Sequence, residues 1–99
     1  MTCTLSHGWT VGLDVRAAQT LTDIEKAAGA RLHDAIVLFA RALAIEVAAA
    51  VAAGKPLAGT RLADGRYAVD VYGEPVLLYY LPVPDSAELR VTDLIWLAT

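Results

Sequence analysis

The last third of the chain alternates between apolar and polar positions with a period of two, the pattern of β-strands. RYAVDVY puts Tyr67 and two valines on one face, whereas VLLYYL is apolar on both faces and is expected to form a central strand covered on both sides. Gly73 between them suits the first central position of a tight hairpin turn. The pattern predicts three consecutive antiparallel strands, at residues 67–72, 76–81 and 89–97.

Helical periodicity fills the middle of the chain. Apolar residues share one stripe of a first helix over residues 16–28, which Asp14 can cap and Gly29 ends. A second helix is expected over residues 31–53, ended by Gly54 and Pro56. Its core stripe has spacings of three and four: Leu32, Ile36, Phe39, Leu43 and Val47.

Residues 9–14, WTVGLD, alternate weakly and are interpreted as a short first strand. The expected order is therefore an N-terminal strand, two helices and a three-stranded antiparallel meander. Such an order predicts an α+β fold in which the helices pack on the sheet. With 99 residues, the chain is expected to form a single domain over residues 1–99.

Composition narrows the function classes. A hydrophobic fraction of 57% with 19% charged residues argues against disorder, and a net charge of −3 provides no general attraction to nucleic acid or anionic membrane. The apolar stretch 36–53 is long enough to resemble a membrane span, but it carries Arg41 and Glu46 and is interpreted as a buried soluble helix. Because no secretory signal is visible and Cys3 is the only cysteine, we expect a cytoplasmic protein with a free thiol.

Familiar catalytic and metal-binding patterns are missing from the sequence. His7 and His33 lack partners at ligand spacing, so we expect no metal site and no cofactor. The segment GKPLAGT lacks the Gly-Lys-Ser/Thr ending of a phosphate loop. Asp70 and Asp93 could form an acid pair, although solvent-facing or edge positions on the sheet explain them more simply.

The order of elements, with the segment KPLAGTRLADGRYAVDVYGEPVLLYYL, resembles the RelE/ParE superfamily of toxins from bacterial type II toxin–antitoxin pairs. The shared features are a Leu-rich link after the helix, a G-x-Y-x-(V/I)-x-V strand, a Gly-containing hairpin and a strand ending in an aromatic residue. The resemblance covers nearly the whole chain but is chiefly structural.

The resemblance also implies where a ribonuclease of this family would carry its site, namely on lysines and arginines of the sheet. This chain has Ala68, Asp70 and Val76 at the matching positions, and Asp70 has the wrong charge beside a phosphate. We therefore expect no enzymatic activity and a toxin-like protein that acts by protein–protein contact. The resemblance implies a cognate antitoxin as partner and, for the ParE branch, DNA gyrase as target.

Two alternatives remain open from the sequence. One is a diverged, non-toxic module that uses the same scaffold for interaction or self-association. The other is a ribosome-dependent mRNA endoribonuclease that uses displaced arginines, with Arg61, Arg66 and Arg90 as candidate anion contacts.

A second apolar patch on the long helix is unexplained by the core stripe. Leu38 and Ile45 lie about 20° apart on the helical wheel, on the side away from that stripe, with Ala48 and Ala52 beside them. We predict that these four residues bind a partner, either a second copy of the chain or an antitoxin segment. The alternative is that the first helix covers them within the monomer.

Overall fold

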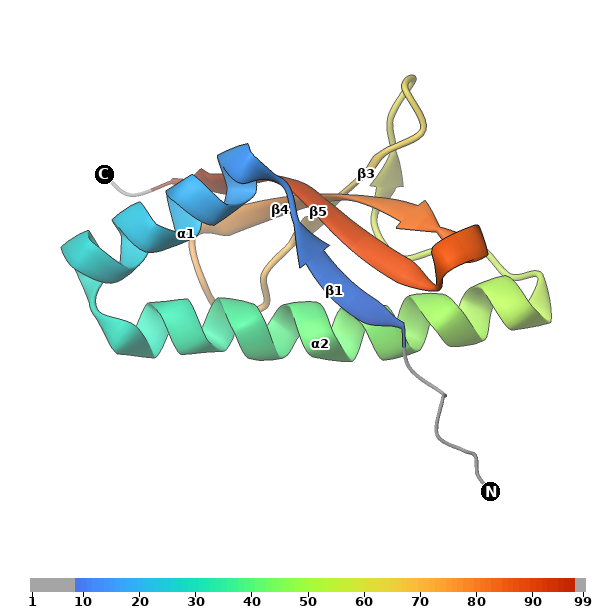
Figure 1. The fold of residues 1–99 in the computed structure, drawn as a ribbon, viewed down its shortest axis with the longest axis horizontal. Coiled ribbons are helices and arrows are strands. Elements are labelled where there is room, and N and C mark those ends of the chain that lie inside the picture. Colours follow the sequence, from blue (N-terminus) through green and yellow to red (C-terminus); the bar gives the residue numbers. More distant parts are fainter. Residues whose placement is uncertain (1–8, 98–99) are drawn as a thin grey trace.

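The computed structural model describes residues 9–97, so the expectations for Cys3 and His7 fall on residues outside the described range. The order of elements is strand, two helices, then four further strands with a short 3-10 turn (Figure 1). Their bounds are β1 Thr10–Leu13, α1 Val15–Ala28, α2 Ala30–Ala53, β2 Thr60–Arg61, β3 Tyr67–Asp70, β4 Val76–Val83, η2 Pro84–Ser86 and β5 Glu88–Trp96.

The strands form one mixed sheet in the order β1-β5-β4-β3-β2. β3, β4 and β5 are the predicted antiparallel meander, and the α+β fold class is confirmed. The sheet differs from the expectation at its two edges. β1 pairs with β5 in parallel, and the two-residue β2, which the sequence did not predict, pairs with the start of β3.

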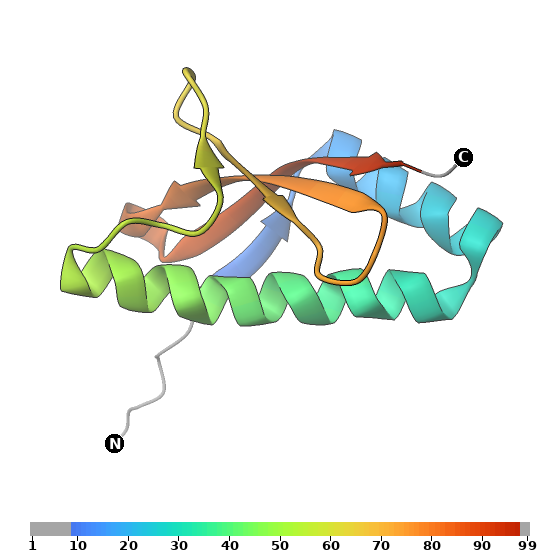
Figure 2. The ribbon, with the colours of Figure 1, turned by 180° about the vertical axis from the view of Figure 1, so that it is seen from behind.

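The core lies between the sheet and the helices. α2 crosses one face of the sheet, while α1 packs against β5 and α2 (Figure 1). The inward residues of both helices, of β4 and β5 and of the β3–β4 turn form one cluster: Ala17, Leu21, Ile24, Leu32, Ile36, Ala40, Leu43, Ala44, Val47, Val71, Val76, Leu78, Tyr80, Leu89, Val91 and Leu94. Seen from behind, the loop between β2 and β3 projects to the side of the sheet opposite α2 (Figure 2).

β4 is central in the sheet, as predicted, but the helices cover only one of its faces. Val76, Leu78 and Tyr80 point into the core and are at most 1% exposed. The alternating residues Leu77 and Tyr79 are half-buried on the other face, where neighbouring side chains cover part of their surface. The apolar character of both faces therefore did not require two helical layers.

Two local expectations need correction. Glu74 donates its amide hydrogen to the carbonyl of Val71, so Gly73, with φ +79°, is the second and not the first central residue of the turn. Asp14 precedes α1 in extended conformation, but its carboxylate caps no amide of the first turn. The side chain lies instead 3.7 Å from Arg90.

The long helix is less buried than its composition suggested. α2 has the length and apolar composition of a membrane span, and 28% of its most apolar 18 residues are buried. Its sheet-facing stripe is in the core, which confirms the predicted core face except at Phe39, which is half-buried. At the N-terminal end, Arg31 donates two hydrogen bonds of 3.0 Å to the carboxylate of Glu74, so an ion pair ties α2 to the β3–β4 turn.

Candidate functional site

The face of the sheet that α2 leaves open carries a polar network at the middle of β4 and β5. An irregularity in the β4–β5 pairing puts Tyr79 opposite Asp93 and Tyr80 opposite Val91, so Thr92 has no direct partner. This bulge turns Asp93 to the same face as Tyr79. The hydroxyl of Thr92 donates to the carbonyl oxygen of Tyr79 at 3.4 Å, which satisfies a polar group at the irregularity.

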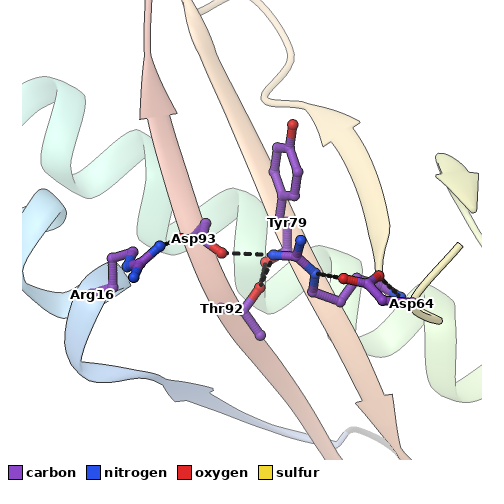
Figure 3. A network of polar contacts seen from close by, with 6 residues as sticks. Arg16, Asp64, Tyr79, Thr92 and Asp93 are labelled. Atoms are coloured by element: carbon purple, nitrogen blue, oxygen red, sulfur yellow. Dashed lines mark hydrogen bonds and ion pairs between the residues drawn. The ribbon is translucent and has the colours of Figure 1, made fainter. Parts of the chain in front are cut away.

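Arg66, at the end of the β2–β3 loop, reaches across this face. Its Nη1 donates to Asp93 Oδ2 at 2.7 Å and to Thr92 Oγ1 at 3.3 Å, while its Nε donates to Asp64 Oδ2 at 2.8 Å (Figure 3). The guanidinium carbon lies 5.2 Å from the ring centre of Tyr79, within the range of a cation–π contact. Arg66 is thus held by Asp64 of its own loop and by a carboxylate, a hydroxyl and an aromatic ring from β4 and β5.

Asp93 lies between two arginines. Arg16, from the first turn of α1, approaches Asp93 Oδ1 to 3.6 Å, on the side opposite Arg66 (Figure 3). The carboxylate side chain is only 17% exposed, whereas that of Arg16 is 83% exposed. Asp93 therefore connects α1 to the β2–β3 loop across β5.

The charges of the network stabilise one another. Hydrogen bonds from the backbone amide and then the side chain of Arg66 lower the pKa of Asp64. The hydrogen bond to Asp64, with the charges of Asp64 and Asp93, raises the pKa of Arg66. Both shifts favour the charged forms of Asp64 and Arg66, and the positive charge of Arg66 is matched by carboxylates of the same chain.

The structure does not gather the three candidate anion contacts into one cluster. Arg61 is exposed in the edge strand β2, Arg66 belongs to the network described above, and Arg90 lies on β5. Arg90 donates to Glu88 Oε1 at 2.9 Å and lies near Asp14. Two of the three arginines thus have carboxylate partners, and their role as anion contacts stays a prediction.

The sheet positions compared with a ribonuclease site also divide between the two faces. Ala68 pairs with Tyr79 and Asp70 with Leu77, so both lie on the open face. Val76 is 1% exposed and points into the core, so its assignment to a phosphate-facing position was wrong. Within residues 9–97, no group of three or more His, Cys, Asp or Glu side chains is arranged to hold a metal ion.

The predicted partner-binding residues lie along the outer side of α2. Leu38 and Ile45 are 64% and 59% exposed, Ala48 is half-buried and Ala52 is exposed. α1 packs along a different side of α2 through Ala17, Leu21 and Ile24, so it does not cover this surface. Binding of a partner there stays a prediction.

Two neighbouring hollows adjoin that surface. One of about 340 Å³ is lined by His33, Asp34, Val37, Leu38 and Arg41 of α2. The other, of about 170 Å³, lies between β1 and the two helices and shares Val37 and Arg41 with the first. The sequence pattern predicted the exposed leucine but gave no signal for the hollows or for the Arg16–Asp93–Arg66 contact.

Comparison with known proteins identifies the architecture. No protein-family model matches the chain, and no curated protein matches it. Among solved structures, the isolated RelE toxin of E. coli superposes with a TM-score of 0.54 at 12% identity, covering 92% of this chain and 86% of that one. The intact E. coli RelBE toxin–antitoxin complex gives a TM-score of 0.47 at 12% identity, covering 87% and 93% of the two chains. The chain therefore has the fold of the RelE toxin.

Proposed function

We propose that this protein is the toxin-like component of a type II toxin–antitoxin pair and acts in the cytoplasm by protein–protein contact rather than by cutting RNA. The RelE fold supports the first part of the proposal. The second part rests on one observation, the position of Asp93 between Arg16 and Arg66 on the open face of the sheet.

Electrostatics explain why this arrangement opposes ribonuclease chemistry. Without a metal, phosphodiester cleavage needs cations that hold the phosphate and stabilise the charge that develops in the transition state. Here the carboxylates of Asp64 and Asp93 already accept hydrogen bonds from Arg66, and Asp70 adds an exposed negative charge on the same face of the sheet. An incoming phosphate would have to displace these contacts on a face that carries three carboxylates. We infer that the face binds RNA weakly and does not cleave it.

The proposed contacts are with proteins. Leu38 and Ile45 expose apolar surface on α2, which favours a partner over open solvent. A cognate antitoxin is the first candidate partner, and DNA gyrase is the proposed target if the chain acts as the ParE branch does. The same exposed surface also favours the alternative of a non-toxic interaction module, which differs from the toxin in leaving growth unaffected.

The decisive in vitro test adds the purified protein to a reconstituted translation system and, separately, to a gyrase supercoiling assay. We expect intact mRNA in the first assay and inhibited supercoiling in the second. Cleavage of mRNA at codon-linked positions would overturn the proposal. Intact mRNA with unaffected supercoiling would remove gyrase as the target.

Asp93→Asn tests the electrostatic argument directly. The substitution removes the charge shared by Arg16 and Arg66 and retains the size of the side chain. We expect the variant to bind a single-stranded RNA oligonucleotide more tightly than the wild type, with an affinity that falls as salt rises. Equal affinity of the two proteins would show that Asp93 does not limit RNA binding. Circular dichroism checks that both are folded.

A further inference from the structure

α2 is apolar on more sides than the fold covers. Its sheet-facing stripe is buried, yet Leu38 and Ile45 on the outer side are more than half exposed. Large apolar side chains exposed together on one side of a helix favour an interaction surface over open solvent. Within residues 9–97, the single chain leaves this side of α2 uncovered.

The shape of this surface suits another helix. Asp34, Val37, Leu38 and Arg41 occupy positions i, i+3, i+4 and i+7, and the hollow of about 340 Å³ lies among them. Four residues with this spacing form the hole that receives one side chain from a facing helix in knobs-into-holes packing. Leu38 borders the hole and is also 64% exposed, so it can serve as a knob for an identical hole.

The charges at the two ends of the hole determine the direction of the facing helix. Asp34 and Arg41 are two turns apart, about 10 Å along the helix axis. A second α2 running antiparallel places each Asp34 against an Arg41, and it does so twice because of the two-fold symmetry. A parallel arrangement places like charges together. The surface is therefore complementary to itself in the antiparallel direction only.

We propose that α2 binds a second copy of the chain in this antiparallel arrangement, with the two-fold axis beside Val37 and Leu38. The proposal deepens the partner-binding role proposed above by naming the partner. Leu38 enters the hole of the partner subunit, and Asp34 pairs with the partner subunit's Arg41. Ile45 lies against the start of the facing helix, while Ala48 and Ala52 fall beyond it and stay free for another protein.

A lipid surface is a poorer occupant for the same reasons. Asp34 and Arg41 flank Leu38 on the face that would enter the bilayer, and burying these charges in lipid is costly even though His33 lies 3.0 Å from the carboxylate of Asp34. In the antiparallel pair both charges meet an opposite charge. The self-complementary pattern thus favours a second copy over a membrane.

Variants that reverse or exchange the charges of Asp34 and Arg41 test the proposal. The dissociation constant of the dimer is measured by sedimentation equilibrium on the purified chain alone at low ionic strength. We expect a dimer for the wild type, and a dissociation constant raised about tenfold or more by Asp34→Arg or by Arg41→Asp, because each creates two like-charge pairs. The double variant Asp34→Arg/Arg41→Asp should restore the wild-type value to within about threefold. Leu38→Glu should abolish the dimer, whereas Leu97→Glu, a control at another half-exposed leucine, should not change it.

Several outcomes would overturn the proposal. A wild-type monomer at about 0.1 mM would do so, as would a dimer that the single charge variants leave unchanged or that the double variant does not restore. Sedimentation of the monomer with phosphatidylglycerol vesicles would assign the surface to a membrane instead. Loss of an antitoxin by Leu38→Glu without any dimer would assign it to the antitoxin. None of these measurements involves growth, translation or gyrase, so failure of the dimer leaves the proposed toxin function intact.

Discussion

Tyr80 fastens the connection between α2 and β2 to the centre of the sheet through one oxygen atom. The side chain lies in β4 and is 0% exposed. Its hydroxyl donates a hydrogen bond of 2.6 Å to the carbonyl oxygen of Ala58, and its ring stacks on Tyr67 with 5.4 Å between centroids. Tyr80→Phe removes the oxygen and keeps the ring, so it isolates the hydrogen bond from the packing.

The size of the expected loss of stability depends on how deeply the Tyr80 hydroxyl and the Ala58 carbonyl are buried. A typical hydrogen bond contributes about 1 kcal/mol net, and a buried carbonyl left without a donor adds a cost of about 1–3 kcal/mol. Ala58 is half-buried, so water can satisfy part of the freed carbonyl. We expect Tyr80→Phe to lower the free energy of unfolding by about 1–2 kcal/mol, which corresponds to a fall in Tm of roughly 5–15 °C for a domain of this size.

Urea unfolding followed by far-UV circular dichroism measures this loss. Tyr79→Phe is the matched control. Tyr79 is the next residue in β4 but points to the open face, and its hydroxyl makes no hydrogen bond within residues 9–97. We expect the control to stay within about 0.5 kcal/mol of the wild type. An equal change in stability for both variants would show that the hydrogen bond from Tyr80 to Ala58 does not stabilise the fold.

Three further predictions concern pH and backbone conformation. Burial raises the pKa of Tyr80 above its ordinary value of 10.0. The stability that the neutral side chain contributes is therefore complete below pH 10.0 and is lost as the pH rises from there towards the folded-state pKa. Tyr80→Phe should abolish this loss of stability at high pH. The hydrogen bonds from Arg31 lower the pKa of Glu74 below its ordinary value of 4.5. Their contribution to the free energy of unfolding is therefore complete above pH 4.5 and is lost as the pH falls through the folded-state pKa. Glu74→Gln should reduce this dependence of stability on pH, as measured by urea unfolding at a series of acidic pH values. Gly59 and Gly65 both have φ +92°, but a side chain at Gly59 would meet a backbone carbonyl and one at Gly65 would meet open space. Gly59→Ala should therefore destabilise the fold by over about 2 kcal/mol and Gly65→Ala by about 1 kcal/mol, as measured by thermal unfolding.

The sequence predicted the elements whose patterns are local. The period of two in the last third gave the three strands of the meander, and the stripe from Leu32 to Val47 gave the buried face of α2. These patterns are visible because a side chain's direction repeats every two residues in a strand and every 3.6 in a helix. β2 has only two residues, too few for any period to appear.

Features that depend on distant pairing could not be predicted in the same way. Nothing local to WTVGLD requires parallel pairing with β5, and the bulge at Thr92 exists only in relation to β4. The contacts of Asp93 with Arg16 and Arg66 depend on the β1–β5 pairing and on the bulge, because they join α1, a loop and β5. Val76 was matched to a phosphate-facing position through the resemblance alone, whereas the face it occupies is set by its pairing with Trp96 of β5.

Cells that express this chain from an inducible promoter test whether it is a toxin-like protein that acts without cutting RNA. The measurement is the integrity of a translated reporter mRNA in cultures whose growth is followed in parallel. We expect growth to stop while the transcript stays full length. Arrest accompanied by cleavage of the transcript within its codons, or undiminished growth, would contradict it.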